Sequence, residues 1–268
     1  MPHDDHRHGL QFDLEALARQ RLRRRGVLAL IGGGAVAAAS TAMPGLAAAA
    51  EACLVDAQTT NGPYPADGTN AAPGNTSNIL AESGVVRADI RSSFGTSTTL
   101  ADGVPLTLRV KLADAGRDCA AVPGATLYVW HCTRDGLYSL YTAPDENYLR
   151  GVQIADADGV VQFATIFPGC YPGRWPHIHF EVYRDAAAAT DHRNAVLTSQ
   201  FAFPRDICET VYAGDGYSQS AANLGRLTLE TDNIFSGATA EQLTMMTPKV
   251  TGSIAEGFVA EVVVAFTA

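Results

Sequence analysis

The sequence predicts an all-β protein, an antiparallel β-sandwich with long loops and a few short helical turns. Short stretches rich in β-branched and aromatic residues recur along the chain, and Gly, Pro or Asp bounds each of them. Amphipathic helical stretches are few. The 268 residues are 47% hydrophobic and 18% charged, a composition typical of a globular domain.

The expected strands begin at residues 106–112, where apolar and polar residues alternate in LTLRVKL. Apolar or β-branched runs predict further strands at residues 125–132, 160–167, 177–183, 196–203 and 257–266. Residues 203–212 and 240–246 each favour only a turn or two of helix. No internal repeat or linker divides residues 51–268, so we expect one domain there.

Residues 1–50 have a different composition and predict a secretory signal. The basic stretch RLRRR, residues 21–25, precedes a Gly- and Ala-rich apolar run, and small residues follow. A membrane helix is the alternative, but the run is rich in Gly and ends at Pro44. Arg24 and Arg25 resemble a twin-arginine (Tat) signal. We therefore expect an exported protein, periplasmic or extracellular, with a mature domain over residues 51–268.

The negative charge of that domain disfavours polyanionic partners, and its cysteines are typical of an exported protein with disulfides. Without the six arginines and four acids of residues 1–50, 13 basic and 24 acidic residues remain, which disfavours nucleic acid and anionic lipid. Five cysteines without CxxC spacing favour one or two disulfides over a metal cluster, and one cysteine must stay unpaired.

His177 and His179 form a His-x-His pair on an expected strand, where side chains at i and i+2 share one face. Such a pair is a common half of a metal site. The spare histidines are poor candidates to complete it, because His131 lies beside a tryptophan on an expected strand and His192 lies in a polar loop. Two tyrosines instead follow glycine-containing turns near the pair, Tyr138 and Tyr171.

Three blocks of this sequence resemble the intradiol ring-cleavage dioxygenases. They are GATLYVWHCTRDGLYS (124–139), FATIFPGCYPGRWPHIHFEV (163–182) and LTSQF (197–201), within a resemblance that extends from about residue 52 to about residue 235. It looks closest to the exported, signal-bearing branch. The resemblance implies a non-haem Fe(III), one per chain, held by Tyr138, Tyr171, His177 and His179.

The resemblance also implies a reaction. The substrates would be a catechol-type aromatic and O2, and the product a muconate-type diacid. Tyr171 would leave the iron when substrate binds and accept a proton, while Tyr138 stays. Arg174 and Gln200 stand where the family places an arginine and a glutamine that stabilise developing charge and orient the substrate.

Two departures from the family pattern matter. The exported branch has a tryptophan where Cys170 stands, which makes Cys170 the expected unpaired thiol. The helical dimerisation arm of the cytoplasmic enzymes has no counterpart, so the oligomeric state stays open.

Two alternative functions also remain. One is a non-catalytic β-sandwich module that binds carbohydrate or cell-wall material, and the other is a copper or zinc site on the His pair.

Overall fold

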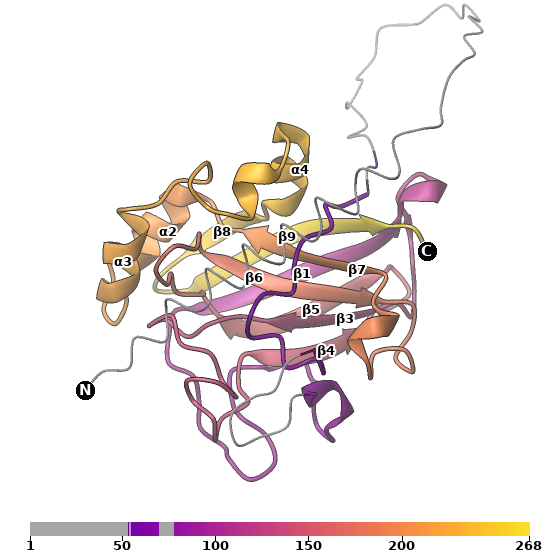
Figure 1. Ribbon diagram of the computed structural model, residues 1–268, viewed down its shortest axis with the longest axis horizontal. Helices are drawn as coiled ribbons and strands as arrows, with labels where there is room; N and C mark the ends of the chain where they lie inside the picture. Colours follow the sequence, from indigo (N-terminus) through magenta and orange to yellow (C-terminus); the bar gives the residue numbers. More distant parts are fainter. Residues whose placement is uncertain (1–52, 54, 70–77) are drawn as a thin grey trace, which may run out of the picture.

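The computed structural model describes residues 53, 55–69 and 78–268, which form two packed β-sheets (Figure 1). The first sheet has the order β2-β1-β9-β8, and β5 pairs with β1. Its strands are β1 (Pro105–Asp114), β2 (Ala120–Ala121), β5 (Val160–Ile166), β8 (Lys249–Ser253) and β9 (Gly257–Phe266). The second sheet has the order β4-β3-β6-β7. Its strands are β3 (Thr126–Trp130), β4 (Arg150–Ile154), β6 (His177–Tyr183) and β7 (Leu197–Ala202).

The two sheets share one hydrophobic core, which confirms the predicted all-β class. Alternate residues of β1, from Leu106 to Leu112, are buried in it, as the alternation predicts. Ile178 and Phe180 of β6 pack into the same core from the second sheet. Burial of these apolar side chains on the facing sides of both sheets stabilises the sandwich.

One strand pair departs from the expected antiparallel arrangement. β9 runs parallel to β1, with Leu106 opposite Phe258 and Asp114 opposite Phe266. A hairpin forces two strands to be antiparallel, as it does for β8 and β9. β1 and β9 are far apart in the sequence, so no hairpin sets their relative direction.

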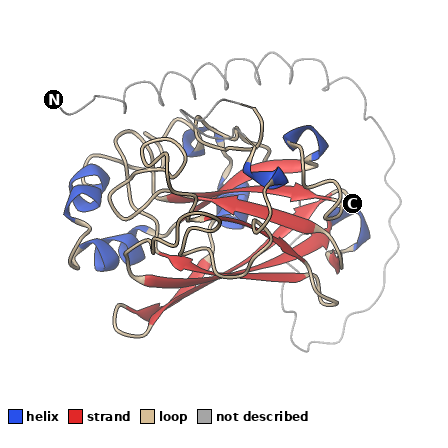
Figure 2. Ribbon diagram, turned by 90° about the horizontal axis from the view of Figure 1, so that it is seen from below, coloured by secondary structure: helices blue, strands red, loops and turns tan. Residues whose placement is uncertain are grey.

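The second sheet is covered on both faces. Tyr128, Trp130 and Tyr183 lie in a second hydrophobic cluster, together with Tyr138 and Tyr171 from loops. Figure 2 shows the loops gathered on one side of the strands. All seven residues of β6 are therefore buried, including the polar ones. The His-x-His pair lies on this loop-covered face rather than in the core between the sheets.

Three short α-helices and four 3₁₀ turns complete the described residues. The helices are α2 (Arg205–Tyr212), α3 (Ser218–Leu224) and α4 (Ala240–Met246), all seen in Figure 1. The 3₁₀ turns are η1 (Ile79–Ala81), η2 (Ala115–Arg117), η3 (His192–Asn194) and η4 (Phe235–Gly237). The two expected helical stretches are confirmed as α2 and α4. Four further elements, α3, β2, β4 and β8, were not predicted from the sequence, because they are short and lack clear periodicity.

A disulfide joins Cys53 to Cys119, with their Cα atoms 5.6 Å apart, and confirms the expectation of a disulfide. Cys170 is unpaired, as the resemblance implied. Cys132 and Cys208 are also free and buried, so three thiols rather than one stay reduced in this part of the chain.

The expected signal, residues 1–50, lies outside the described residues. Among the residues that the structure describes, no helix is long and apolar enough to cross a membrane.

Candidate metal centre

Strand β6 brings His177 and His179 together on its loop-covered face. Their Nε2 atoms lie 3.0 Å apart, and both side chains are buried. His177 Nδ1 lies 2.5 Å from the carbonyl oxygen of Trp175, which can only accept a hydrogen bond. Nδ1 therefore carries the proton, and the lone pair of His177 Nε2 faces His179.

A tight turn before Tyr138 delivers its ring to the same place. Gly136 has a φ of +82°, and a Cβ there would lie 3.0 Å from the Cβ of Tyr171. The turn therefore needs glycine for both its backbone conformation and its close contact. The amide of Leu137 donates to Thr133 Oγ1, and the amide of Tyr138 donates to Thr142 Oγ1.

Tyr171 reaches the centre from the loop between β5 and β6. Its Oη lies 3.4 Å from His177 Nε2, and its ring centroid lies 5.8 Å from that of Tyr138. Helix α3 holds the loop, because Ser220 accepts from the amide of Cys170 and Asn223 donates to the Cys170 carbonyl. Tyr171 is 7% exposed, against 1–2% for the other three residues.

The centre contains buried polar atoms that protein groups do not satisfy. Among the described residues, the Tyr138 hydroxyl and His179 Nδ1 have no hydrogen-bond partner. Burial lowers the pKa of His177 to about 3 and that of His179 well below its usual value. Burial, and secondarily Tyr171, raises the pKa of Tyr138 well above its usual value. The histidines are neutral, and the site as it stands disfavours any charge.

A bound cation would instead favour the ionised form of the two phenol groups. Metal ions lower the pKa of coordinated oxygen groups, so Tyr138 and Tyr171 could bind as phenolates. Two phenolates and two neutral imidazoles form a set of oxygen and nitrogen donors suited to Fe(III). The donor set and the unsatisfied Tyr138 hydroxyl therefore fit the iron that the sequence analysis expects.

Arg174 and Gln200 lie beside this centre. Arg174 Nη2 donates to Gln200 Oε1 at 2.5 Å, and Nη1 lies 3.5 Å from Tyr171 Oη. The Gln200 amide group also donates to the carbonyl oxygen of Thr60, at 3.1 Å. The structure therefore brings together the six residues named from the sequence: Tyr138, Tyr171, Arg174, His177, His179 and Gln200.

Sequence reasoning missed Asp232, which holds Arg174. Asp232 Oδ2 accepts from Arg174 Nε at 3.0 Å and from the Trp175 amide at 2.7 Å. Its Oδ1 accepts from the amides of Ile234 and Phe235. Aspartates commonly accept hydrogen bonds from backbone amides two or three residues later in the chain, mostly in surface turns. The local sequence around Asp232 therefore does not reveal its buried contact with Arg174.

The two spare histidines contact other groups. His131 is buried, with its ring nitrogens 2.8 Å from the Cys132 carbonyl oxygen and 2.7 Å from Thr165 Oγ1. Both nitrogens are thus engaged in the core. His192 lies in η3, with Nδ1 3.6 Å from Glu181 Oε1.

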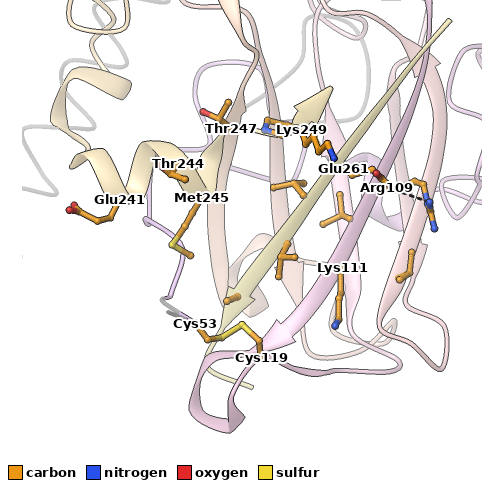
Figure 3. A pocket seen from close by; sticks show the side chains of 16 residues that line it. Cys53, Arg109, Lys111, Cys119, Glu241, Thr244, Met245, Thr247, Lys249 and Glu261 are labelled. Carbon is orange, nitrogen blue, oxygen red and sulfur yellow. Dashed lines mark hydrogen bonds and ion pairs between the residues drawn. A yellow bond between two sulfur atoms is a disulfide. The ribbon is translucent and has the colours of Figure 1, made fainter. Parts of the chain in front are cut away.

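A cavity of about 930 Å³ also occurs in the fold, but it contains none of the six residues. Figure 3 shows it beside α4, with the Cys53–Cys119 disulfide at one end. Aliphatic side chains of β9 and the charged groups of Arg109, Lys111 and Glu261 line it. Its lining offers no set of metal ligands, so the buried centre is the better candidate site.

Comparison with known proteins finds sequences similar to part of this chain. A family model described as Dioxygenase matches residues 88–217. The chlorocatechol 1,2-dioxygenase of Rhodococcus opacus is 34% identical over 91 residues, which cover 29% of this chain and 35% of that enzyme. The chlorocatechol 1,2-dioxygenase of Pseudomonas sp. (strain P51) is 31% identical over 105 residues, which cover 32% of this chain and 39% of that enzyme. This chain thus spans little more than a third of the length of these relatives.

A solved structure has the same fold. The intradiol ring-cleavage dioxygenase from Tetranychus urticae superposes with a TM-score of 0.57 at 23% identity, over 69% of this chain and 88% of that one. Residues 88–217, the segment that matches the family model described as Dioxygenase, contain both tyrosines and both histidines of the centre.

Proposed function

We propose that this protein is a non-haem Fe(III) dioxygenase. It cleaves the ring of catechol-type aromatics between the two hydroxyl-bearing carbons and uses O2 to give muconate-type diacids. The observation that carries the proposal is the meeting of Tyr138, Tyr171, His177 and His179 in one buried centre, inside the segment that matches the family. These four side chains hold one iron per chain.

The chemistry that bound iron supplies is the activation of an aromatic diolate toward O2. The protein fixes the donor atoms for it, because His177 is oriented by Trp175 and both tyrosines are positioned by turns. The loops that cover β6 keep the centre away from bulk water, which strengthens electrostatic interactions there.

Tyr171 is the residue that moves a proton. It is the most exposed of the four, and its Oη is 3.5 Å from Arg174 Nη1. A catechol that bound as a dianion would lose two hydroxyl protons, of which the Tyr171 phenolate would accept one and a hydroxide from solvent the other. Tyr138 is 2% exposed and lies deeper among aromatic rings, so it stays in place.

Arg174 and Gln200 orient the substrate and stabilise the negative charge that develops on it. The guanidinium group is fixed by Asp232 on one side and by Gln200 on the other, so it is preorganised before substrate arrives. Preorganised donors need no rearrangement during the reaction, which is why they lower the barrier.

We further propose that the protein is exported by the Tat route. The support is the sequence of residues 1–50, with Arg24 and Arg25 ahead of the apolar run. An exported enzyme would meet catechols released from plant or lignin-derived aromatics, and we propose such a catechol as its substrate. Replacement of both arginines by lysine should trap the precursor inside the cell. Unchanged export, or an exported form that retains residues 1–50 on N-terminal sequencing, would contradict this part of the proposal.

The proposed reaction is tested on protein purified from iron-replete cells. We expect about one iron per chain, a visible tyrosinate-to-iron absorption band, and O2 consumption with catechol. His177→Ala should abolish all three, because the remaining donors cannot hold the ion. Tyr148→Phe is the matched control, since Tyr148 lies outside the centre and should leave all three unchanged.

The alternatives give different results. A folded, colourless and metal-free protein would favour a non-catalytic binding module. Copper or zinc in place of iron, without the visible band, would favour a different metal on the His pair. Either result would overturn the iron assignment.

A further inference from the structure

A second group of metal-binding side chains lies outside the candidate centre. Asp67 comes from the loop segment 55–69, Glu181 from β6 and His192 from η3. One ligand atom from each lies within 4.8 Å of the others. Glu181 follows His179 by two residues on the same strand, but none of the three belongs to the tyrosine and histidine centre.

The ligand atoms face one another without hydrogen bonds between them. His192 Nδ1 lies 3.6 Å from Glu181 Oε1 and 3.8 Å from Asp67 Oδ2, both beyond hydrogen-bond length. Among the described residues, Glu181 Oε1 and His192 Nδ1 are buried atoms without any hydrogen-bond partner. Glu181 is fully buried, so this oxygen has no access to solvent either.

The remaining atoms of the two acids are held in place. Tyr183 donates its hydroxyl to Glu181 Oε2 at 2.6 Å. Asn61 donates to Asp67 Oδ2 at 2.9 Å, and the Thr69 amide donates to Asp67 Oδ1 at 2.9 Å. Such outer contacts orient metal ligands in known sites and leave the ligating lone pairs free.

The ligand types of this group suit a cation. Two carboxyl groups and an imidazole converge, and among the described residues Glu181 Oε1 and His192 Nδ1 have no hydrogen-bond partner. Arg193, the neighbour of His192, turns to Asp191 instead. A divalent ion would bind the free lone pairs of these ligand atoms.

We propose that Asp67, Glu181 and His192 bind a zinc ion. Zinc bonds of about 2.0–2.2 Å to nitrogen and oxygen place tetrahedral ligand atoms roughly 3.3–3.6 Å apart. The separations of 3.6 and 3.8 Å from His192 Nδ1 to the two acids are close to this. Calcium prefers six to eight oxygen ligands and is a poor match for an imidazole. His192 is about one third exposed, so the ion can enter past it, and water supplies the fourth ligand.

The ion ties three distant parts of the chain together. It links segment 55–69 and η3 to β6, the strand that carries His177 and His179. Because a preformed site is absent from the unfolded chain, zinc binding stabilises the folded state. The site is independent of the proposed oxygenase reaction, and its test does not use that reaction.

The test is a zinc titration of the purified full-length protein, after a chelator wash that removes loosely bound metal. The iron content is measured in the same samples. We expect one further zinc per chain and a rise in the unfolding temperature on adding zinc. His192→Ala should weaken zinc binding about 10- to 100-fold and leave the iron content unchanged. Glu181→Gln should have the same effect. Glu256→Gln, an exposed acid in the turn between β8 and β9, is the matched control and should bind zinc as the wild type does.

If Glu181→Gln does not fold, His192→Ala still tests the proposal, because His192 is only partly buried and its replacement should be tolerated. Absence of a zinc-dependent rise in unfolding temperature, or zinc binding that His192→Ala leaves unchanged, would overturn the proposal. Zinc that replaces iron one for one would also overturn it, because the ion would then occupy the tyrosine and histidine centre.

Discussion

Arg174 and Asp232, 58 positions apart in the sequence, form an ion pair that is fully buried beside the candidate centre. Nε of the arginine lies 3.0 Å from Oδ2 of the aspartate, and the side chains are 1% and 0% exposed. Burial raises the pKa of Asp232, but Arg174 and the amides of Phe235 and Trp175 outweigh it and hold that pKa below its usual value. The carboxylate is therefore ionised and positions the guanidinium group that also contacts Tyr171 and Gln200.

Removal of this carboxylate should cost both stability and turnover. Asp232→Ala removes the carboxylate that pairs with the buried Arg174, and we expect the free energy of unfolding to fall by about 3–5 kcal/mol, measured by urea denaturation. Asp232→Asn keeps an acceptor for the backbone amides and should be milder. Under the proposed function, a misplaced Arg174 should lower kcat by about 10²-fold with a smaller change in KM. The exposed Asp215→Ala is the control, and equal effects from both variants would contradict the positioning role.

Tyr171 and Tyr138 should behave differently when their hydroxyl groups are removed. Under the proposed function, Tyr171→Phe should keep most of its iron and still bind catechol, because the lost ligand would be the one that substrate displaces. Its turnover should fall by about 10²-fold or more, the scale of a positioned proton acceptor. Tyr138→Phe should mainly lose iron, since under the proposed function Tyr138 would stay bound throughout. Iron analysis and O2 uptake check both, and wild-type turnover by Tyr171→Phe would rule out its proton-accepting role.

Asp56 should make stability depend on pH. Burial raises its pKa to about 7, against the hydrogen bond that its carboxylate accepts from the Ala265 amide. The folded state therefore holds this proton more tightly than the unfolded state. The resulting stabilisation is fully present below about pH 4 and is lost as the pH rises to about 7, up to roughly 4 kcal/mol in total.

Asp56→Asn removes this titration and keeps an acceptor for Ala265. Between pH 4 and pH 7 its free energy of unfolding should therefore fall less than that of the wild type. Urea denaturation at several pH values measures the difference. Asp158→Asn, at an exposed position between β4 and β5, should retain the wild-type pH profile. Parallel curves for Asp56→Asn and the wild type would show that Asp56 does not titrate in this range.

The Cys53–Cys119 disulfide should contribute strongly to stability, because it closes a loop with a sequence separation of 66 residues. Loop-closure entropy predicts a loss of about 4 kcal/mol for the double variant Cys53→Ser/Cys119→Ser. A reductant should lower the unfolding temperature of the wild type and leave that of the double variant unchanged. If the reductant lowered the unfolding temperature of the wild type and of the double variant equally, the Cys53–Cys119 disulfide would not be the source of the stabilisation.

The sequence by itself determined the sandwich class and much of the candidate centre. Alternation in residues 106–112 predicts β1 with its buried face, and the run 177–183 predicts β6 with its observed bounds. Both signals are local, because a strand sends every second side chain to one face. The same rule places His177 and His179 side by side. The glycine-containing turns mark Tyr138 and Tyr171, but only the resemblance to a family joins them to the histidines.

Only the tertiary structure decided the contacts between segments that are distant in the chain. These include the parallel pairing of β1 with β9, the approach of Asp232 to Arg174, and the meeting of Asp67, Glu181 and His192. Each depends on how whole elements pack, and the local residues around Asp67 or Asp232 are those of ordinary polar turns. Periodicity reports which face of an element is buried. It does not report which distant side chain will share that burial, because the free energy of such a contact depends on positions set by the rest of the core.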